Sequence, residues 1–188
     1  MRMADSNTTK KLLANALKEL MQETSFHKIT ISDICNRCNM SRKSFYYHFK
    51  DKYDLVNWIF DSEYLSTIPD RFAAENELYD SRWDLIENIC WYLYANNTFY
   101  SKVFRIKGQN CFTDYFRELA EPLLAVRVQA ITQDPTLIKF STAFYGDAFL
   151  SALERWIVEY NSITPAEFIK LLKTSVDITS IDILPQKN

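Results

Sequence analysis

The chain has 188 residues, 47% of them hydrophobic, which suits one or two domains with a buried core and argues against intrinsic disorder. Two glycines and five prolines are too few turn-forming residues for an all-β protein. The net charge of −2 hides an asymmetry, because residues 1–53 have a balance of +5 and residues 54–188 have −7. We therefore predict an all-α fold whose basic N-terminal part contacts a polyanion while the acidic remainder does not.

The first two helices are predicted from an apolar stripe and a capping motif. Apolar residues recur on one helical face from Leu12 to Met21, in a helix that we predict to begin at Thr8. The stretch TISD, residues 30–33, then opens a second helix that ends near residue 37. Thr30 can cap this helix, and Asp33 stands at the capping-box position near the positive end of the helix dipole.

A tight turn and a third helix follow. Asn39 tolerates the left-handed backbone of a turn better than most residues, and Ser41 is a good N-cap. Phe45 and Phe49, four residues apart, give the new helix one buried face. The span from Thr30 to Phe49 therefore predicts a helix-turn-helix.

Six further helices complete a predicted total of nine. Asp51 can cap the fourth, and Pro69 with the polar run up to residue 81 marks a linker. The last two helices each begin with a capping residue followed by proline. The predicted ranges are 51–67, 82–96, 98–106, 110–132, 135–160 and 165–177. We divide the chain into residues 1–50, which contain the helix-turn-helix, and residues 51–188, which contain the other helices.

The outward face of the third helix carries cations, hydroxyls and aromatic rings, which suit a DNA groove. Long cations at the helix N-terminus pair well with guanine, and a tyrosine can pack against a thymine methyl group. Side chains further around the helix lie closer to phosphates. Any one of these residues alone is typical of a solvated face, but together with the cap and the turn they favour DNA binding. The candidate base contacts are Arg42, Lys43, Ser44 and Tyr47, and the candidate phosphate contacts are Ser32, Tyr46, His48 and Lys52, with the stretch TTKK at 8–11 in support.

The stretch TISDICNRCNMSRKSFYYHFKDKYDLV resembles the DNA-binding domain of the TetR family of transcriptional regulators. The resemblance covers residues 8–60 and includes the aromatic block SFYYHF. It implies that residues 42–44 and 47 read bases and that Tyr46, His48 and Lys52 contact phosphates. The chain departs from the family pattern at the turn, where Asn39 replaces a glycine, and in the preceding helix, where cysteines at 35 and 38 replace alanines.

The stretch 144–172 is similar to the last two helices of family members in which these helices form a four-helix dimer interface. This implies a homodimer on a near-palindromic operator, with recognition helices about 34–36 Å apart or somewhat more. By the same resemblance, residues 1–50 are expected to form the DNA-binding domain and residues 51–188 a helical domain for dimerisation and effector binding. Gly146 suits a close helix crossing, either between two copies or within one chain. We predict that the dimer interface includes Phe140, Phe144, Phe149, Leu153 and Trp156.

Aromatic residues in the C-terminal part either line a pocket for a small apolar or aromatic effector or fill an ordinary core. The candidate pocket residues are Trp91, Phe104, Phe112, Phe116 and Tyr145. With a pocket, we expect a repressor that the effector releases from DNA when it changes the separation of the two DNA-binding domains. The alternative is an activator controlled by a protein partner, since the chain also resembles, more weakly, the branch of DhaS-type activators, whose co-regulator is a protein. A third alternative is a helical interaction module that no longer binds DNA.

The remaining sequence patterns do not favour redox, metal-binding or catalytic chemistry. The pair in CNRC, residues 35–38, has redox or metal-ligand spacing but falls on the buried stripe of its helix, and no second pair exists. No catalytic motif is present, so we predict a non-enzyme without a metal or cofactor. The chain starts without a signal-peptide pattern and contains no long apolar run, which predicts a cytoplasmic protein with reduced thiols and no membrane contact.

Overall fold

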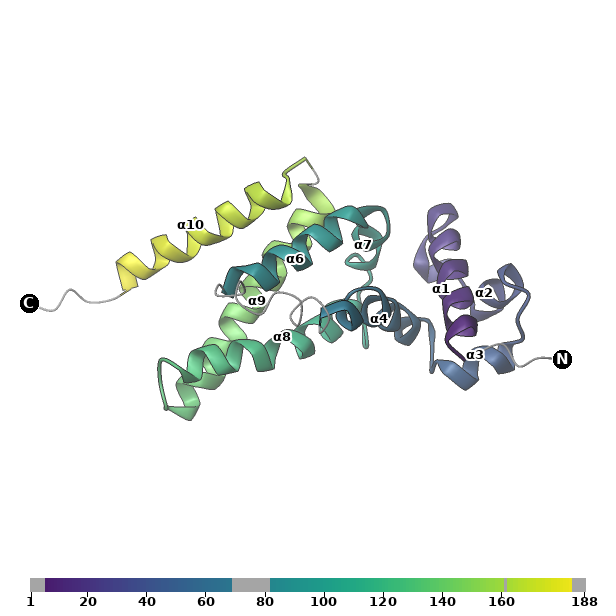
Figure 1. The fold of residues 1–188 in the computed structure, drawn as a ribbon, viewed down its shortest axis with the longest axis horizontal. Helices are drawn as coiled ribbons and strands as arrows, with labels where there is room; N and C mark the ends of the chain where they lie inside the picture. The colour runs from purple at the N-terminus through teal and green to yellow at the C-terminus, as the bar shows by residue number, and fades with distance from the viewer. Residues whose placement is uncertain (1–5, 69–81, 161, 184–188) are drawn as a thin grey trace, which may run out of the picture.

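The computed structural model describes residues 6–68, 82–160 and 162–183. This part of the chain contains nine α-helices, two 3-10 turns and no strand, which confirms the all-α prediction. Figure 1 shows an elongated molecule with the N-terminal helices at one end. No helix in the described ranges has the length and apolar character needed to cross a membrane. The elements are α1 (Ser6–Glu23), η1 (Phe26–Lys28), α2 (Ile31–Arg37), α3 (Arg42–His48), α4 (Lys52–Glu63), η2 (Leu65–Thr67), α6 (Arg82–Ala95), α7 (Asn97–Val103), α8 (Phe112–Gln129), α9 (Pro135–Glu159) and α10 (Pro165–Ile183).

Side-chain caps begin several of these helices where the sequence predicts them. Thr30 and Asp33 form a reciprocal capping box at the start of α2. Ser41 accepts a backbone hydrogen bond at the start of α3, and Asp51 does so at the start of α4. Asp134 caps α9 in the same way, with a proline in the first helical position. These caps satisfy amides that have no partner within the helix.

The observed helix ends differ from the predicted ones in the middle of the chain. α4 ends at Glu63, and the 3-10 turn η2 occupies the rest of the range predicted for that helix. α7 ends at Val103 and α8 begins at Phe112. Between them Gly108 and Asn110 have φ angles of 122° and 61°, which are incompatible with a right-handed helix. The predicted linker from Pro69 to residue 81 lies outside the described residues.

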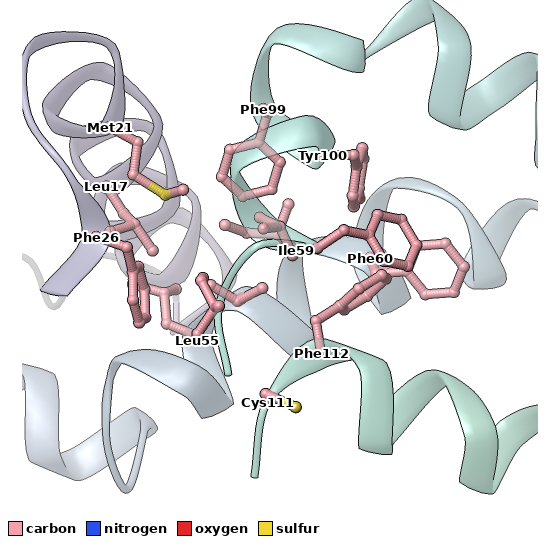
Figure 2. Close-up of a cluster of buried hydrophobic side chains, with 14 of the residues drawn as sticks. Leu17, Met21, Phe26, Leu55, Ile59, Phe60, Phe99, Tyr100, Cys111 and Phe112 are labelled. Carbon is pink, nitrogen blue, oxygen red and sulfur yellow. The ribbon is translucent and has the colours of Figure 1, made fainter. Parts of the chain in front are cut away.

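Helix α4 joins the two ends of the molecule through one continuous apolar core. We call α1–α3 the head and α6–α10 the body. Figure 2 shows Ile59 of α4 near Leu17 and Met21 of the head, while Phe60 points towards the body. The ring of Phe60 lies 5.3 Å from that of Phe112, centroid to centroid. Because both sides pack on α4, a movement of the head disturbs contacts with the body.

Candidate nucleic-acid interface

Helix α3 separates a buried face from a face that is open to solvent. Phe45 and Phe49 are buried, and their rings contact each other. Tyr47, on the other side of the helix, is 81% exposed, and Tyr46 is 51% exposed. Large aromatic rings with this exposure contribute little to folding and are available to a partner.

The turn before α3 holds this helix against α2. Asn39 has a φ of 55°, the left-handed conformation that the sequence predicts for the turn. The amide of Met40 donates to the carbonyl of Cys35 at 2.8 Å and closes the turn. Ser41 then caps α3 by accepting from the amide of Ser44 at 3.1 Å. The local geometry is therefore that of a helix-turn-helix with α3 as the outer helix.

Cationic groups stand beside the exposed rings. The guanidinium of Arg42 lies 5.9 Å from the ring centroid of Tyr46, and Lys43 is exposed next to it. From α1, the ammonium of Lys10 reaches to 5.8 Å from the ring centroid of Trp58. Burial, and then the positive charge of Lys10, lower the pKa of His48. His48 is therefore neutral near pH 7 in the free chain, and its hydrogen bonds, rather than a charge, are what it can offer a phosphate.

Lys52 has a different environment from the one that the sequence predicts. Its ammonium donates to the backbone carbonyls of Phe26 and Ile29, both at 2.7 Å, and lies 4.4 Å from the ring centroid of Phe26. Burial lowers the pKa of this ammonium. The prediction of a phosphate contact is corrected here, because the charge faces the end of η1 and ties α4 to the head.

The two thiols of CNRC are structural in this fold. Cys35 is buried in the head core, and Cys38 is half-buried with its thiol directed at the carbonyl of Ile34, 3.3 Å away. Burial raises the pKa of both thiols, which makes them poor nucleophiles. All four cysteines of the chain are free. Within the described ranges, no three potential ligands gather in a group that could hold a metal ion.

The residues predicted to line an effector pocket do not come together. Phe104, Phe112 and Phe116 are buried and fill the core, with ring centroids 5.4 Å apart for the first pair and 5.9 Å for the second. Trp91 and Tyr145 are instead half exposed on the surface. The prediction is wrong for these five residues as a set, because helical spacing turns three rings inward and the other two outward.

A recess lies between α8 and α9, but it is far too small for an effector. It encloses about 40 Å³, between Phe116 and Arg117 on one side and Thr142 and Gly146 on the other. Ligand pockets usually enclose several hundred Å³. The guanidinium of Arg117 bonds to the carboxylate of Asp147 at 2.9 Å across the same helix pair. This recess holds a few waters at most.

Helix α9 has two apolar faces, and only one of them is covered by its own chain. Leu153 and Trp156 are buried, and the indole ring of Trp156 stacks on Phe168 with centroids 4.4 Å apart. These two residues cannot form a dimer interface, which corrects the prediction for them. Phe140 and Phe144 are 67% and 58% exposed, whereas Phe149 is half-buried. Phe140 and Phe144 therefore remain candidates for the predicted dimer interface.

The ion pairs of the head, either with the rest of the chain or within the head itself, are not predicted from the sequence. Lys18 of α1 pairs with Glu63 at the end of α4, with 2.6 Å between nitrogen and oxygen. Within the head, Arg37 bonds to Glu23 at 2.7 Å and to Glu19 at 3.4 Å. Since Lys18 and Glu63 are 45 positions apart, no local pattern in the sequence signals their contact.

Comparison with known proteins relates both parts of the chain to transcriptional regulators. A sequence model described as bacterial regulatory proteins, tetR family, matches residues 13–59, and a model described as transcriptional regulator C-terminal region matches residues 81–177. The dhaKLM operon transcriptional activator DhaS of Lactococcus lactis is 35% identical over 107 residues. That match covers 55% of this chain and 53% of the relative, which is about half of each.

Solved structures share the arrangement of helices over nearly the whole chain. The dihydroxyacetone kinase operon activator DhaS superposes with a TM-score of 0.58 at 25% identity, covering 90% of this chain and 97% of that one. A TetR-family regulator from Syntrophomonas wolfei gives a TM-score of 0.68 at 16% identity, covering 97% and 100%. FadR of Thermus thermophilus gives 0.56 at 13%, covering 95% and 97%. The last two likenesses concern the fold alone. The two sequence models together span the helix-turn-helix and most of the body. The chain therefore belongs to the TetR family of transcriptional regulators.

Proposed function

We propose that this chain binds near-palindromic duplex DNA as a homodimer and acts there as a transcriptional regulator. The observation that carries the proposal is the outer face of α3, where exposed Tyr46 and Tyr47 stand beside Arg42 and Lys43. A short, capped helix with exposed cations near its N-terminus fits the major groove. The basic balance of residues 1–53 supplies the attraction to phosphates.

The individual roles follow from position on α3. Arg42 and Lys43, in the first turn, are best placed for base edges, where cations prefer guanine. Ser44 and Tyr47 complete the proposed base contacts. Tyr46 and His48, together with Ser32 in the first turn of α2, are proposed to bind phosphates. Lys52 has no direct role here, because it is bonded to the backbone of the head.

The exposed face of α9 supports the homodimer. Leu137, Phe140 and Phe144 follow one another at helical spacing on this face and are all exposed. An apolar face of this kind, continuous over two turns, suits burial against a second copy. A two-fold axis through this region would present two α3 helices to successive major grooves.

We further infer that a protein partner, rather than a small molecule, controls the regulator, and that it activates transcription. The rings of Phe104, Phe112 and Phe116 fill the interior of the described body, which supports control from the surface. The likeness to a protein named as an activator supports the direction of regulation. Release of a repressor by a small effector is the competing possibility, since one protein of the same fold, FadR, was solved in complex with lauroyl-CoA.

Selection of binding sites from random duplexes tests the DNA-binding part of the proposal. We expect the purified protein to enrich a near-palindrome whose affinity falls steeply with salt, by roughly 0.9 in the logarithmic slope per phosphate contacted. Lys43→Ala should weaken the selected site by about 1–3 kcal/mol. Lys170→Ala, which removes an exposed lysine from α10, is the matched control and should bind normally. A folded dimer that enriches no sequence would contradict the proposal.

Thermal unfolding in the presence of candidate effectors tests the mode of control. Lauroyl-CoA and small aromatic acids should leave the melting temperature unchanged if the body holds no ligand. A saturable rise of several degrees would show a bound ligand and favour the repressor alternative, because a ligand that binds only the folded state stabilises it. An unchanged melting temperature, combined with DNA binding in the selection, would favour the protein-controlled activator.

A further inference from the structure

Glu63, the last residue of α4, is bonded from the head and from the body at once. The ammonium of Lys18, on α1, lies 2.6 Å from each of its two carboxylate oxygens. From the other side, the hydroxyl of Tyr92, on α6, donates to Oε2 at 3.2 Å. This carboxylate is therefore a point at which the head, the connecting helix and the body meet.

The bonds continue into the body through a second phenol. The hydroxyl of Tyr92 lies 2.9 Å from that of Tyr100, which is buried on α7. Burial raises the pKa of both phenols, so both keep their protons. Since Tyr92 gives its single proton to Glu63, Tyr100 must donate to Tyr92. The bonds thus form a directed chain that ends on the negative charge of Glu63 and is completed by Lys18.

The same face of α1 makes further contacts with α7. The ammonium of Lys102 donates to the backbone carbonyl of Met21, in the last turn of α1. The ammonium of Lys18 also lies 5.4 Å from the ring centroid of Phe99. Figure 2 shows the apolar side of this contact, where Met21 of α1 extends towards Phe99 of α7. Apolar packing is non-directional, whereas hydrogen bonds require defined positions, so the polar groups determine how the head is seated on the body.

We propose that Glu63 is a positioning residue for DNA binding: through Lys18 and Tyr92 it sets the angle of the head on the body, and so the half-site spacing that the dimer accepts. This inference rests on the proposed function. Glu63 lies at the far end of α4 from α3, and no bond joins it to the outer face of α3 among the described residues. Loss of the Glu63 carboxylate should therefore leave the binding of one DNA-binding head to a single half-site intact. It should weaken only the simultaneous binding of both heads of the dimer to two half-sites.

Duplexes with two copies of the selected half-site, separated by a spacer that varies one base pair at a time, test this proposal. The unmodified protein should prefer one spacing over its neighbours by roughly fivefold or more. Glu63→Gln, which removes the charge but not the shape, should flatten this preference. Its affinity for a duplex with a single half-site, measured at low salt, should equal that of the unmodified protein. Lys18→Arg should preserve the spacing preference, and Lys18→Met should flatten it.

Glu154→Gln is the matched control, because Glu154 also forms an ion pair, with Lys107, but within the body. Its spacing profile should be unchanged. An unchanged profile for Glu63→Gln would overturn the inference, as would an equal loss on single and double half-sites, which indicates a general folding defect. Hydrogen exchange without DNA separates this failure from that of the proposed function. Glu63→Gln should speed exchange in residues 18–23 and 97–103 even if no duplex binds, and unchanged exchange would also refute the positioning role.

Discussion

Aromatic side chains have opposite environments in the head and in the body. On α3, Tyr46 and Tyr47 extend into solvent. In the body, Phe112 is buried and contacts several other rings, including those of Phe60 and Tyr100. Helices α3 and α8 both carry a dense aromatic cluster in the sequence, so the residue types alone do not distinguish a binding surface from a core.

This contrast in exposure indicates which part of the molecule has side chains free to bind a ligand, DNA or a second copy of the chain. A ring that is already packed contributes to folding and has little free surface for a ligand. A ring in solvent can bury its surface later, against a groove or a second copy of the chain. We therefore expect substitutions of body aromatics to affect stability, and substitutions of α3 aromatics to affect binding.

The largest expected effect separates these two classes directly. Phe112→Ala should lower the free energy of unfolding by about 3–5 kcal/mol, because it removes a large ring from a packed core. Tyr47→Ala should change it by no more than about 0.5 kcal/mol. Urea unfolding followed by circular dichroism measures both. A similar loss in the two variants would show that the exposed ring on α3 also stabilises the fold.

The exposed rings of α9 are the body's counterpart of the α3 surface. Phe144→Asp should weaken dimerisation by about 2 kcal/mol or more, roughly 30-fold in the dissociation constant, if this ring is central to the interface. Sedimentation velocity over a range of concentrations measures the change. Tyr160→Ser, at the end of the same helix and also exposed, should leave the dimer intact. An unaffected Phe144→Asp dimer would place the interface elsewhere.

Helix caps should have the same moderate value in both parts of the molecule. In the head, Asp33 accepts from the amide of Thr30 at 2.8 Å, and in the body Glu167 accepts from the amide of Thr164 at 2.8 Å. The reciprocal bonds, at 3.2 and 3.3 Å, are equally similar. Thr30→Ala and Thr164→Ala should each cost about 1 kcal/mol in the free energy of unfolding, which thermal denaturation can measure. A much larger loss for one of them would reveal a tertiary role for that threonine.

The capping motifs also show why part of the structure is predictable from the sequence. Thr30 and Asp33 are three positions apart, and the turn at Asn39 is governed by the conformational preferences of a single residue. The helix-turn-helix is a series of such short-range features. Its geometry follows from the order of the residues, and prediction and structure agree there.

The site predictions fail where contacts between residues far apart in the sequence determine which side chains are buried or paired. The predicted interface contains both Phe144 and Trp156, because the spacing of apolar residues on α9 does not show that its own chain covers Trp156 and leaves Phe144 exposed. The ammonium of Lys52 is occupied by carbonyls at positions 26 and 29, which only the packing of α4 on the head brings near. The pair of Lys18 and Glu63 depends on the same packing. Such contacts require the positions of the helices to be known first.

The smallest effects concern two carboxylates whose pKa values shift in opposite directions. In the body contact of α4, desolvation raises the pKa of Asp61 above 3.8, although Tyr115 donates a hydrogen bond to it. In the head, bonds from Thr30 lower the pKa of Asp33 below 3.8. The charged form of Asp61 thus destabilises the folded state, whereas the charged form of Asp33 stabilises it.

The two amide variants should therefore respond to pH with opposite signs. At pH 7, Asp61→Asn should be slightly more stable than the unmodified protein, because the amide oxygen can still accept from Tyr115 and no charge is desolvated. This advantage should vanish as the pH falls through the raised pKa of Asp61 towards 3.8, since the folded protein then binds the proton itself. Asp33→Asn should be less stable at pH 7, and its deficit should vanish only as the pH falls below 3.8. Urea titrations at a series of pH values measure both differences. A loss of stability in Asp61→Asn at pH 7 would mean that its bond to Tyr115 requires the charge and outweighs the desolvation.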